Sequence, residues 1–227
     1  MIRVSLFRIS IFSVSLFILS FTACQKTPLP DVIGVTNSCD GYCSYTVGSY
    51  WIYQHVLIDS NGVEQILTTT DTVSIVGDSI INGQTYAAVK GKLIPYSSLF
   101  PSGIINHVRD SLHYLVSYTG TILFSSQDFS SILTQDSTVS TNAGSTVTNY
   151  YSHKMEDVVD SVNLPAGTFK VLNYERTASS TDSLINSMFA YKNSNQYYAK
   201  GVGKVLHSFV FSNKRYLEHR LLEYHIE

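Results

Sequence analysis

The sequence predicts a mostly β protein, an antiparallel sheet of about ten strands with little helix. Short runs of β-branched and aromatic residues recur between residues 50 and 226, separated by Gly, Asn, Asp and Ser turn signals. Aromatic residues make up 12% of the chain, with 16 tyrosines, whereas only 14% of residues are charged. The runs do not alternate with helical segments, as parallel βαβ units would require. A single β-rich domain accounts for these features.

The expected strands can be placed in chain order. The first, residues 51–58, ends at Asp59-Ser60-Asn61-Gly62, whose Asn-Gly pair is a strong hairpin signal. A second Asn-Gly pair, Asn82-Gly83, predicts a type I′ turn between residues 80–81 and 84–86. The other strands are expected at residues 66–70, 72–76, 112–118, 121–124, 169–174, 188–191, 205–211 and 215–226.

Four segments are expected to interrupt the strands. Residues 96–100 and 125–133 are short enough for single helical turns. Residues 135–149 and 177–187 are rich in Ser, Thr, Asn and Asp, which predicts long loops.

Glycines define two further turns. Pro165-Ala166-Gly167 predicts a type II turn, since proline fixes φ and glycine permits a positive φ. Gly201 and Gly203 do not form a dinucleotide fingerprint, because position 206 is Leu206 and a strand follows. A bend or bulge of the sheet is the better interpretation there.

The N-terminal residues resemble a lipoprotein signal peptide. Arg3 and Arg8 precede an apolar run of residues 9–21, which is shorter than the roughly 20 residues that a spanning helix needs. Phe21-Thr22-Ala23-Cys24 resembles the lipobox of bacterial lipoproteins, in which a lipidated cysteine follows the cleavage site. We therefore expect residues 1–23 to be removed and Cys24 to carry the lipid. An uncleaved membrane helix and simple secretion are the alternatives.

The same segment predicts the location of the protein. Two or three acyl chains on Cys24 would anchor it firmly to a membrane. Gln25, rather than an aspartate, follows the cysteine, which favours the outer membrane. The residues after it lack the acidic run of surface-exported lipoproteins, which favours the periplasmic leaflet. Residues 24–46 are expected to form a lipidated tether, and residues 47–227 the single β-rich domain.

Two cysteines lie within the expected tether. Cys39 and Cys43 can form a small disulfide loop in an oxidising envelope compartment. Two free thiols are the alternative, and a metal site is disfavoured because no further paired ligands stand nearby in the sequence.

Four motifs resemble a set of uncharacterised Bacteroidetes lipoproteins: residues 47–53 (VGSYWIY), 82–86 (NGQTY), 164–169 (LPAGTF) and 201–205 (GVGKV). The similarity spans about residues 47–226. It implies a curved sheet or half-barrel related to the lipoprotein carrier LolA, in which a sheet wraps around a helix or an apolar groove. The family has no established activity, and this sequence departs from the pattern in its low helix content.

No signature of catalysis or of a cofactor is present. The sequence lacks a Gly-x-Ser-x-Gly elbow, a Ser-x-x-Lys, a His-Glu-x-x-His and a phosphate loop. His219 and His225 lie on one face of the last expected strand but about 20 Å apart, too far to share a metal. We therefore expect no enzyme activity, no cofactor and no metal. A formal net charge of -2 without a polybasic run argues against nucleic-acid binding.

These features favour a non-catalytic binding module or carrier in the cell envelope, with an apolar or a glycan ligand. The alternative is a structural or accessory lipoprotein that docks an envelope protein partner, and a hydrolase is less favoured. Trp51 and Tyr53 share a strand face, for which core packing is favoured over a sugar-binding platform. In a carrier, a groove would be lined by one of the two faces of the strand at 205–211: either Val205, His207, Phe209 and Phe211, or Leu206, Ser208 and Val210. The first set is bulkier and slightly polar, which suits a groove better. The sequence predicts no specific ligand-binding residue.

Overall fold

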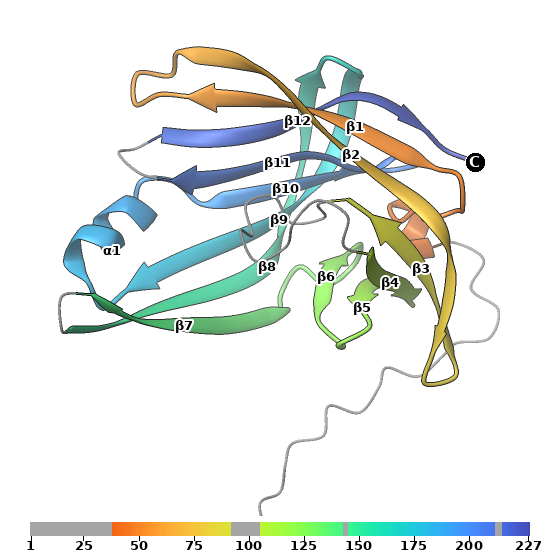
Figure 1. Ribbon diagram of the computed structural model, residues 1–227, viewed down its shortest axis with the longest axis horizontal. Helices are drawn as coiled ribbons and strands as arrows, with labels where there is room; N and C mark the ends of the chain where they lie inside the picture. Colours follow the sequence, from red (N-terminus) through yellow and green to blue (C-terminus); the bar gives the residue numbers. More distant parts are fainter. Residues whose placement is uncertain (1–37, 92–104, 143–144, 212–214) are drawn as a thin grey trace, which may run out of the picture.

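The computed structural model describes residues 38–91, 105–142, 145–211 and 215–227. They form one antiparallel sheet of 12 strands (Figure 1). The strands are β1 (Tyr50–Ile58), β2 (Glu64–Ile81), β3 (Gln84–Lys90), β4 (Ile105–Ser111), β5 (Tyr114–Ser117), β6 (Ile122–Ser125), β7 (Thr134–Asn142), β8 (Ser145–Leu164), β9 (Gly167–Ser180), β10 (Ser194–Ala199), β11 (Gly203–Phe211) and β12 (Arg215–His225). The helical elements are the short 3₁₀ turn η1 (Ser38–Gly41) and the helix α1 (Ser183–Phe189). The predicted antiparallel β fold with little helix is confirmed.

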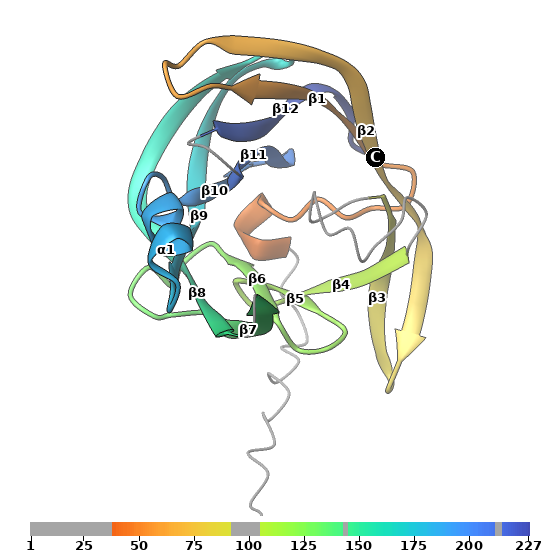
Figure 2. The same ribbon diagram turned by 60° about the vertical axis from the view of Figure 1, so that its left-hand side comes forward.

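The sheet curls until its two edge strands approach one another (Figure 2). Its strand order is β6-β5-β4-β3-β2-β1-β12-β11-β10-β9-β8-β7, so the first and last strands pair at its centre. Side chains join the edge strand β6 to β7 and to β9: Thr134 Oγ1 of β7 and Tyr174 Oη of β9 both donate hydrogen bonds to the Ile122 carbonyl, at 2.9 and 3.0 Å. We call this junction the seam. The expected half-barrel is therefore nearly closed.

The concave face of the sheet holds the core. Trp51 and Tyr53 are buried there, and their side chains donate hydrogen bonds to the carbonyls of Val202 and Lys204, each at 2.7 Å. This confirms core packing for both aromatic residues. Phe124 is fully buried near the seam and packs on Tyr198, with ring centroids 4.3 Å apart.

Part of the expected tether is inside the barrel. Cys39 and Cys43 form a disulfide, with their Cα atoms 5.4 Å apart, and both belong to the buried core. η1 lies within the curve of the sheet in Figure 2, and the Gly201 amide donates to the Gly41 carbonyl at 2.7 Å. The domain boundary expected at residue 47 is thus too late, because the residues from Ser38 onward fill space that the sheet alone leaves open.

Both expected hydroxyl-rich loops are instead regular structure. Most of residues 135–149 belongs to the β7–β8 hairpin, and residues 177–187 form the end of β9 and most of α1. Threonine suits a strand, and serine is tolerated on a solvent-exposed sheet face, so loop-like composition was misleading. The strand expected at residues 188–191 is wrong, since α1 occupies its first half after Asp182 caps the helix by accepting from the Ile185 amide at 3.0 Å. The helical turn expected at residues 96–100 lies outside the described residues, and the one expected at 125–133 is wrong, since Ser125 ends β6 and residues 126–133 are irregular.

The turns agree in part with the predictions. Asn82 and Gly83 have φ values of 52° and 78°, as the predicted type I′ turn requires. At the Pro165-Ala166-Gly167 turn, Gly167 takes the expected positive φ, but the turn is not type II: Leu164 pairs with Gly167, and Ala166 has no positive φ. Gly167 itself, at φ 135°, resumes the strand after the turn. Within the described ranges, no helix is long and apolar enough to cross a membrane.

Candidate functional site

A cavity of about 260 Å³ lies inside the barrel at the seam. Its walls come from β5–β11 and from Tyr45 of the segment that enters the barrel. Leu115, Ile122 and Leu123 form an apolar side. The polar lining comprises Thr121, Thr134, Asp136, His153, Tyr174, Arg176, Gln196, Lys204 and His207. We call this space the seam cavity.

Lys204 reaches the seam cavity because of a β-bulge. The pairing of β10 with β11 shifts between Tyr197 and Tyr198, which pair with Leu206 and Lys204. The extra residue on β11 allows Lys204 and His207, three positions apart, to line the same cavity. Lys204 Nζ donates to Gln196 Oε1 at 3.1 Å, and burial lowers the pKa of the ammonium to about 8. Simple strand alternation does not predict this placement.

Two histidines on the cavity wall are held neutral. Burial, followed by the nearby charge of Lys204, holds the pKa of His207 well below its ordinary value. Burial and then Arg176 also lower the pKa of His153, although Asp136 opposes the shift. The His153 ring stacks on Tyr174 with centroids 5.3 Å apart. Burial raises the pKa of Tyr174 to about 12, so its hydroxyl stays protonated and donates across the seam.

The charge of the seam cavity favours an anion. The lining contains the guanidinium of Arg176, the amine of Lys204, which is charged below its pKa of about 8, and one carboxylate, Asp136. Arg176 also lies over the Tyr151 ring, 3.8 Å from its centroid, which orients the guanidinium. Such an arrangement can bind an acidic group through charge-assisted hydrogen bonds.

A second polar cluster lies at the centre of the sheet. His55 of β1 is the direct cross-strand partner of His219 of β12, and their rings stack with centroids 4.1 Å apart. Asp71 of β2 accepts a hydrogen bond from His55, with Nε2 and Oδ2 3.1 Å apart, and its Oδ2 is 3.9 Å from His219 Nδ1. We call these three residues the histidine–aspartate cluster. The cluster adjoins the seam cavity through His207, whose ring centroid is 6.4 Å from that of His219.

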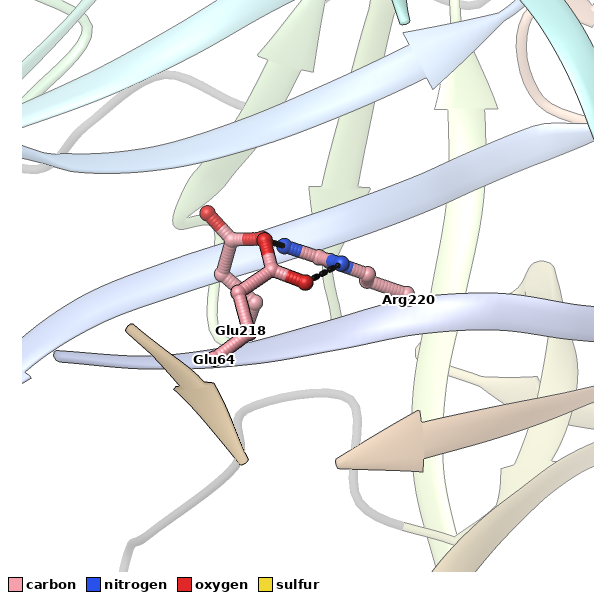
Figure 3. Close-up of polar contacts among 3 residues, drawn as sticks. All are labelled: Glu64, Glu218 and Arg220. Carbon is pink, nitrogen blue, oxygen red and sulfur yellow. Dashed lines mark hydrogen bonds and ion pairs between the residues drawn. The ribbon is translucent and has the colours of Figure 1, made fainter. Parts of the chain in front are cut away.

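An ion-pair network is formed by the outward-facing side chains of β12. Glu218 and Arg220 alternate with the buried Leu217, His219 and Leu221. Arg220 binds Glu64 of β2 through both terminal nitrogens, with Nη1 2.8 Å from Oε2, and its Nε is 2.7 Å from Glu218 Oε2. Figure 3 shows the guanidinium bonded to the two carboxylates. Since β1 lies between β2 and β12, this network ties together the three strands that carry the histidine–aspartate cluster.

The predicted site residues are only partly brought together. Cys24 lies outside the described residues, so its lipidation stays a prediction. Cys39 and Cys43 form a disulfide, so the alternative of two free thiols does not hold. Of the expected groove face, Val205 and His207 are buried, and His207 lines the seam cavity.

Sequence reasoning missed the residues that dominate both sites. Lys204, Arg176 and Gln196 of the seam cavity come from three strands, and although Lys204 lies in the 201–205 motif, no local pattern marks any of the three as a binding residue. His55 and Asp71 were not associated with His219, because the two chain ends meet only in the folded sheet. One signal for the cluster was available in the sequence, namely a polar residue at a strand position that alternation places on the apolar face. His55 and His219 both occupy such positions.

Comparison with known proteins gives distant structural neighbours. No protein-family model matches the chain, and no curated protein matches it. A candidate lipoprotein from Parabacteroides distasonis shares 15% identity at a TM-score of 0.38, covering 81% of this chain and 98% of its own. A candidate exported protein with a YmcC-like fold from Bacteroides fragilis shares 9% identity at a TM-score of 0.40, covering 79% and 96%. Scores this low establish no family for the chain, and they do not test the four motifs.

Proposed function

We propose that this chain is a lipid-anchored protein of the bacterial cell envelope that binds a small anionic ligand in the seam cavity, without catalysing a reaction on it. The proposal rests on the excess of basic side chains in that cavity, which has Arg176 and Lys204 but only one carboxylate, Asp136. The cations come from β9 and β11, so the sheet fixes both in place. A preorganised site of this kind loses little conformational entropy on binding.

The size of the seam cavity narrows the expected ligand. Pockets for drug-sized molecules usually have about 300–1,000 Å³, and this one has about 260 Å³. It suits a compact molecule better than a lipid with full acyl chains or an oligosaccharide. Because Leu115, Ile122 and Leu123 form one wall, the ligand should combine an acidic group with a small apolar part. Short-chain and aromatic carboxylates meet both requirements.

The buried lysine adds a thermodynamic reason for an anionic ligand. An ammonium group loses hydration on burial, and the lowered pKa of Lys204 expresses that cost. A carboxylate in the seam cavity would favour the charged form again. Ligand binding should therefore raise the pKa of Lys204 as well as stabilise the fold.

A binding role without catalysis is consistent with the chemistry of the cavity. His153 and His207 are the available bases, and the buried Nδ1 of each has no hydrogen-bond partner among the described residues. Tyr174 uses its hydroxyl to close the seam. The lining thus offers recognition groups rather than an activated nucleophile.

The envelope location rests on the N-terminal sequence. The basic residues, the apolar run and Cys24 are the features of a lipoprotein signal. We propose outer-membrane anchoring with the domain facing the periplasm. Protease treatment of intact cells tests the orientation, since a periplasmic domain would be protected and a surface domain digested.

Ligand titration tests the binding proposal. Purified chain is mixed with butyrate, hexanoate, benzoate and glucuronate, and with the matched neutral amides, while thermal unfolding and Trp51 fluorescence are followed. Trp51 is a suitable reporter because it shares a small space with Lys204 beside the cavity. At 100 times its Kd a ligand should stabilise the native state by about 2.7 kcal/mol. Carboxylates should stabilise the protein, and amides should not.

A pair of lysine variants makes the test specific. Lys204→Met should weaken carboxylate binding at least about tenfold, since a charge-assisted hydrogen bond contributes about 1.5–3 kcal/mol. Lys200→Met, in the exposed turn between β10 and β11, should leave binding unchanged. The proposal fails if no carboxylate shifts the melting temperature, or if the two variants behave alike.

A hollow lined by residues of β7, β8 and β9 favours a second candidate function, the docking of an envelope protein partner. It measures about 640 Å³ and lies over β7, β8 and β9, where Tyr150 is 51% exposed. β7 is also an edge strand of the sheet, which a partner strand can extend. A photo-crosslinker at position 150 should then capture one defined envelope protein, whereas one at position 113 should not. Absence of a specific product at position 150 would remove this alternative.

A further inference from the structure

We propose that His55, Asp71 and His219 form a binding site for a divalent transition-metal ion. The three side chains come from β1, β2 and β12, which are neighbours at the centre of the sheet. They offer two imidazole nitrogens and one carboxylate oxygen, and these ligand atoms all lie within 4.8 Å of one another. The proposal is independent of the ligand suggested for the seam cavity, and it departs from the expectation, drawn from the sequence, that the protein binds no metal.

The spacing of the ligand atoms fits a shared ion. Ligands at about 2.0–2.2 Å from a tetrahedral ion lie about 3.3–3.6 Å from one another. Asp71 Oδ2 is 3.1 Å from His55 Nε2, slightly less than this spacing, and 3.9 Å from His219 Nδ1, slightly more. Because a metal lies in the plane of each imidazole that binds it, the stacked rings of His55 and His219 would have to rotate out of their stack when the ion binds.

The backbone aims these side chains at one point. His55 and His219 are direct cross-strand partners and point to the same concave face. The pairing of β1 with β2 shifts between Gln54 and Val56, leaving His55 beside a β-bulge. The bulge lets Thr69 and Asp71 both reach His55 from β2. Bulges of this kind often re-aim side chains at functional sites.

Thr69 supplies the outer contact that metal-binding histidines usually have. Its Oγ1 is 3.1 Å from His55 Nδ1, on the opposite side of the ring from Asp71. With a metal on Nε2, the Nδ1 proton is directed to Thr69 Oγ1, and the ring is held in the ligating tautomer. The network joining Arg220, Glu64 and Glu218 links β2 to β12 across β1 on the other side of the sheet. The site is therefore supported from both directions.

The environment also suits a partly coordinated ion. The side chains of His55, Asp71 and His219 are only 9%, 20% and 5% exposed. His207, the partner of His219 on β11, has a buried Nδ1 with no hydrogen-bond partner among the described residues. A water on the open position of the ion would have this imidazole as a neighbour. Three protein ligands and one water is a common arrangement for zinc.

The donor set indicates the class of ion. Imidazole suits zinc, copper, iron and nickel, whereas calcium and magnesium prefer sites made of oxygen. One carboxylate and two neutral imidazoles would leave a divalent ion with a local charge of +1. Zn²⁺ is the appropriate first probe, and Co²⁺ reports the coordination through its visible absorption.

The experiment measures Zn²⁺ binding to the full chain, purified in detergent without a histidine tag and freed of metal with a chelator. Titration calorimetry should show one Zn²⁺ per chain. Asp71→Asn and His219→Gln, which keep the size of each side chain, should each weaken binding by at least about 100-fold, more than the loss of an outer contact costs. Thr69→Val should weaken it by about tenfold.

The matched control is His225→Gln. His225 lies on the same strand but is half exposed and bonded to Glu227, so its loss should leave Zn²⁺ binding unchanged. The proposal is overturned if the wild-type chain takes up no Zn²⁺ at about 1 mM, or if His225→Gln weakens binding as much as His219→Gln. Where a variant fails to fold by circular dichroism, the Co²⁺ spectrum of the wild-type chain decides: nitrogen coordination supports the site, and the spectrum of the hydrated ion contradicts it.

Discussion

Lys204 shows how one residue connects the fold with its proposed function. Its backbone carbonyl accepts the Tyr53 hydroxyl in the core, while its ammonium group donates to Gln196 at the seam cavity. Burial makes the charged form costly, which lowers the pKa to about 8. The side chain therefore reduces the stability of the ligand-free protein in exchange for a cation at the cavity.

A pH-dependent stability measurement tests this cost. The unfolded lysine has an ordinary pKa near 10.5 and the folded one about 8, so between these values the unfolded state binds more protons. The contribution of Lys204 to the free energy of unfolding should then rise as the pH increases from about 8 to about 10.5. Lys204→Met should be more stable than wild type at pH 7, and this advantage should shrink above pH 8.

Urea denaturation across that pH range measures the free energy of unfolding of Lys204→Met and of wild type. Subtracting one from the other cancels the contributions of the other titrating groups, because both proteins share them. Lys200→Met, at an exposed position, provides the comparison and should show a constant small difference from wild type. A difference between Lys204→Met and wild type that does not change with pH would contradict the buried-charge interpretation.

At the scale of the elements, the seam decides whether the sheet is an open half-barrel or nearly closed. β6 and β7 are the two ends of the strand order, and the Ile122 carbonyl accepts hydrogen bonds from Thr134 and Tyr174. The segment that enters the barrel adds to the closure, because Ser126 Oγ beyond β6 donates to Asp40 Oδ2 at 2.7 Å. This bond, with the one from Gln127, lowers the pKa of Asp40. Side chains thus replace the backbone ladder that a fully closed barrel would have.

Tyr174→Phe tests the role of the seam. Removing this hydroxyl should cost about 1 kcal/mol in the free energy of unfolding, with a further penalty for leaving a buried carbonyl with one bond fewer. Amide hydrogen exchange in β6 and β7 should quicken, while the central strands β1 and β12 should keep their protection. Tyr150→Phe, at a half-exposed hydroxyl on β8, is the control and should change neither quantity. Unchanged exchange in β6 would show that the seam does not depend on this bond.

At the scale of the whole molecule, the chain combines a nearly closed barrel with an N-terminal segment that begins inside it. The disulfide between Cys39 and Cys43 lies in the core, and the Gly41 carbonyl is bonded to the turn between β10 and β11. Any tether to a membrane would therefore end before Ser38 rather than at residue 47. A shorter tether would hold the domain closer to the lipid surface.

Cys24→Ala tests the anchor. Without the thiol that accepts the lipid, the protein should move from the membrane fraction to the soluble fraction, and the acyl mass should disappear from its N-terminal peptide. A double variant, Cys39→Ser with Cys43→Ser, serves as the control: it removes the other two cysteines and should leave fractionation unchanged. Lipidation at Cys24 would be refuted by unaltered fractionation together with no acyl group on the wild-type peptide.

The sequence by itself determined the features that depend on neighbouring residues. Strand composition and Asn-Gly turns predicted the antiparallel β fold, and the type I′ turn at Asn82-Gly83 is confirmed. The close spacing of Cys39 and Cys43 made their disulfide one of two alternatives. Composition failed where serine and threonine occupy strands, because an exposed sheet face accepts the same residues as a loop.

Only the tertiary structure decided which polar residues meet. His55 and Asp71 join His219 because the first and last strands of the chain pair at the centre of the sheet, and no local pattern specifies that pairing. Bulges in β1–β2 and in β10–β11 then shift the alternation of side chains, which places Lys204 and His207 on one cavity. Strand alternation is a property of the local backbone, whereas both sites arise from register and closure over long distances in sequence.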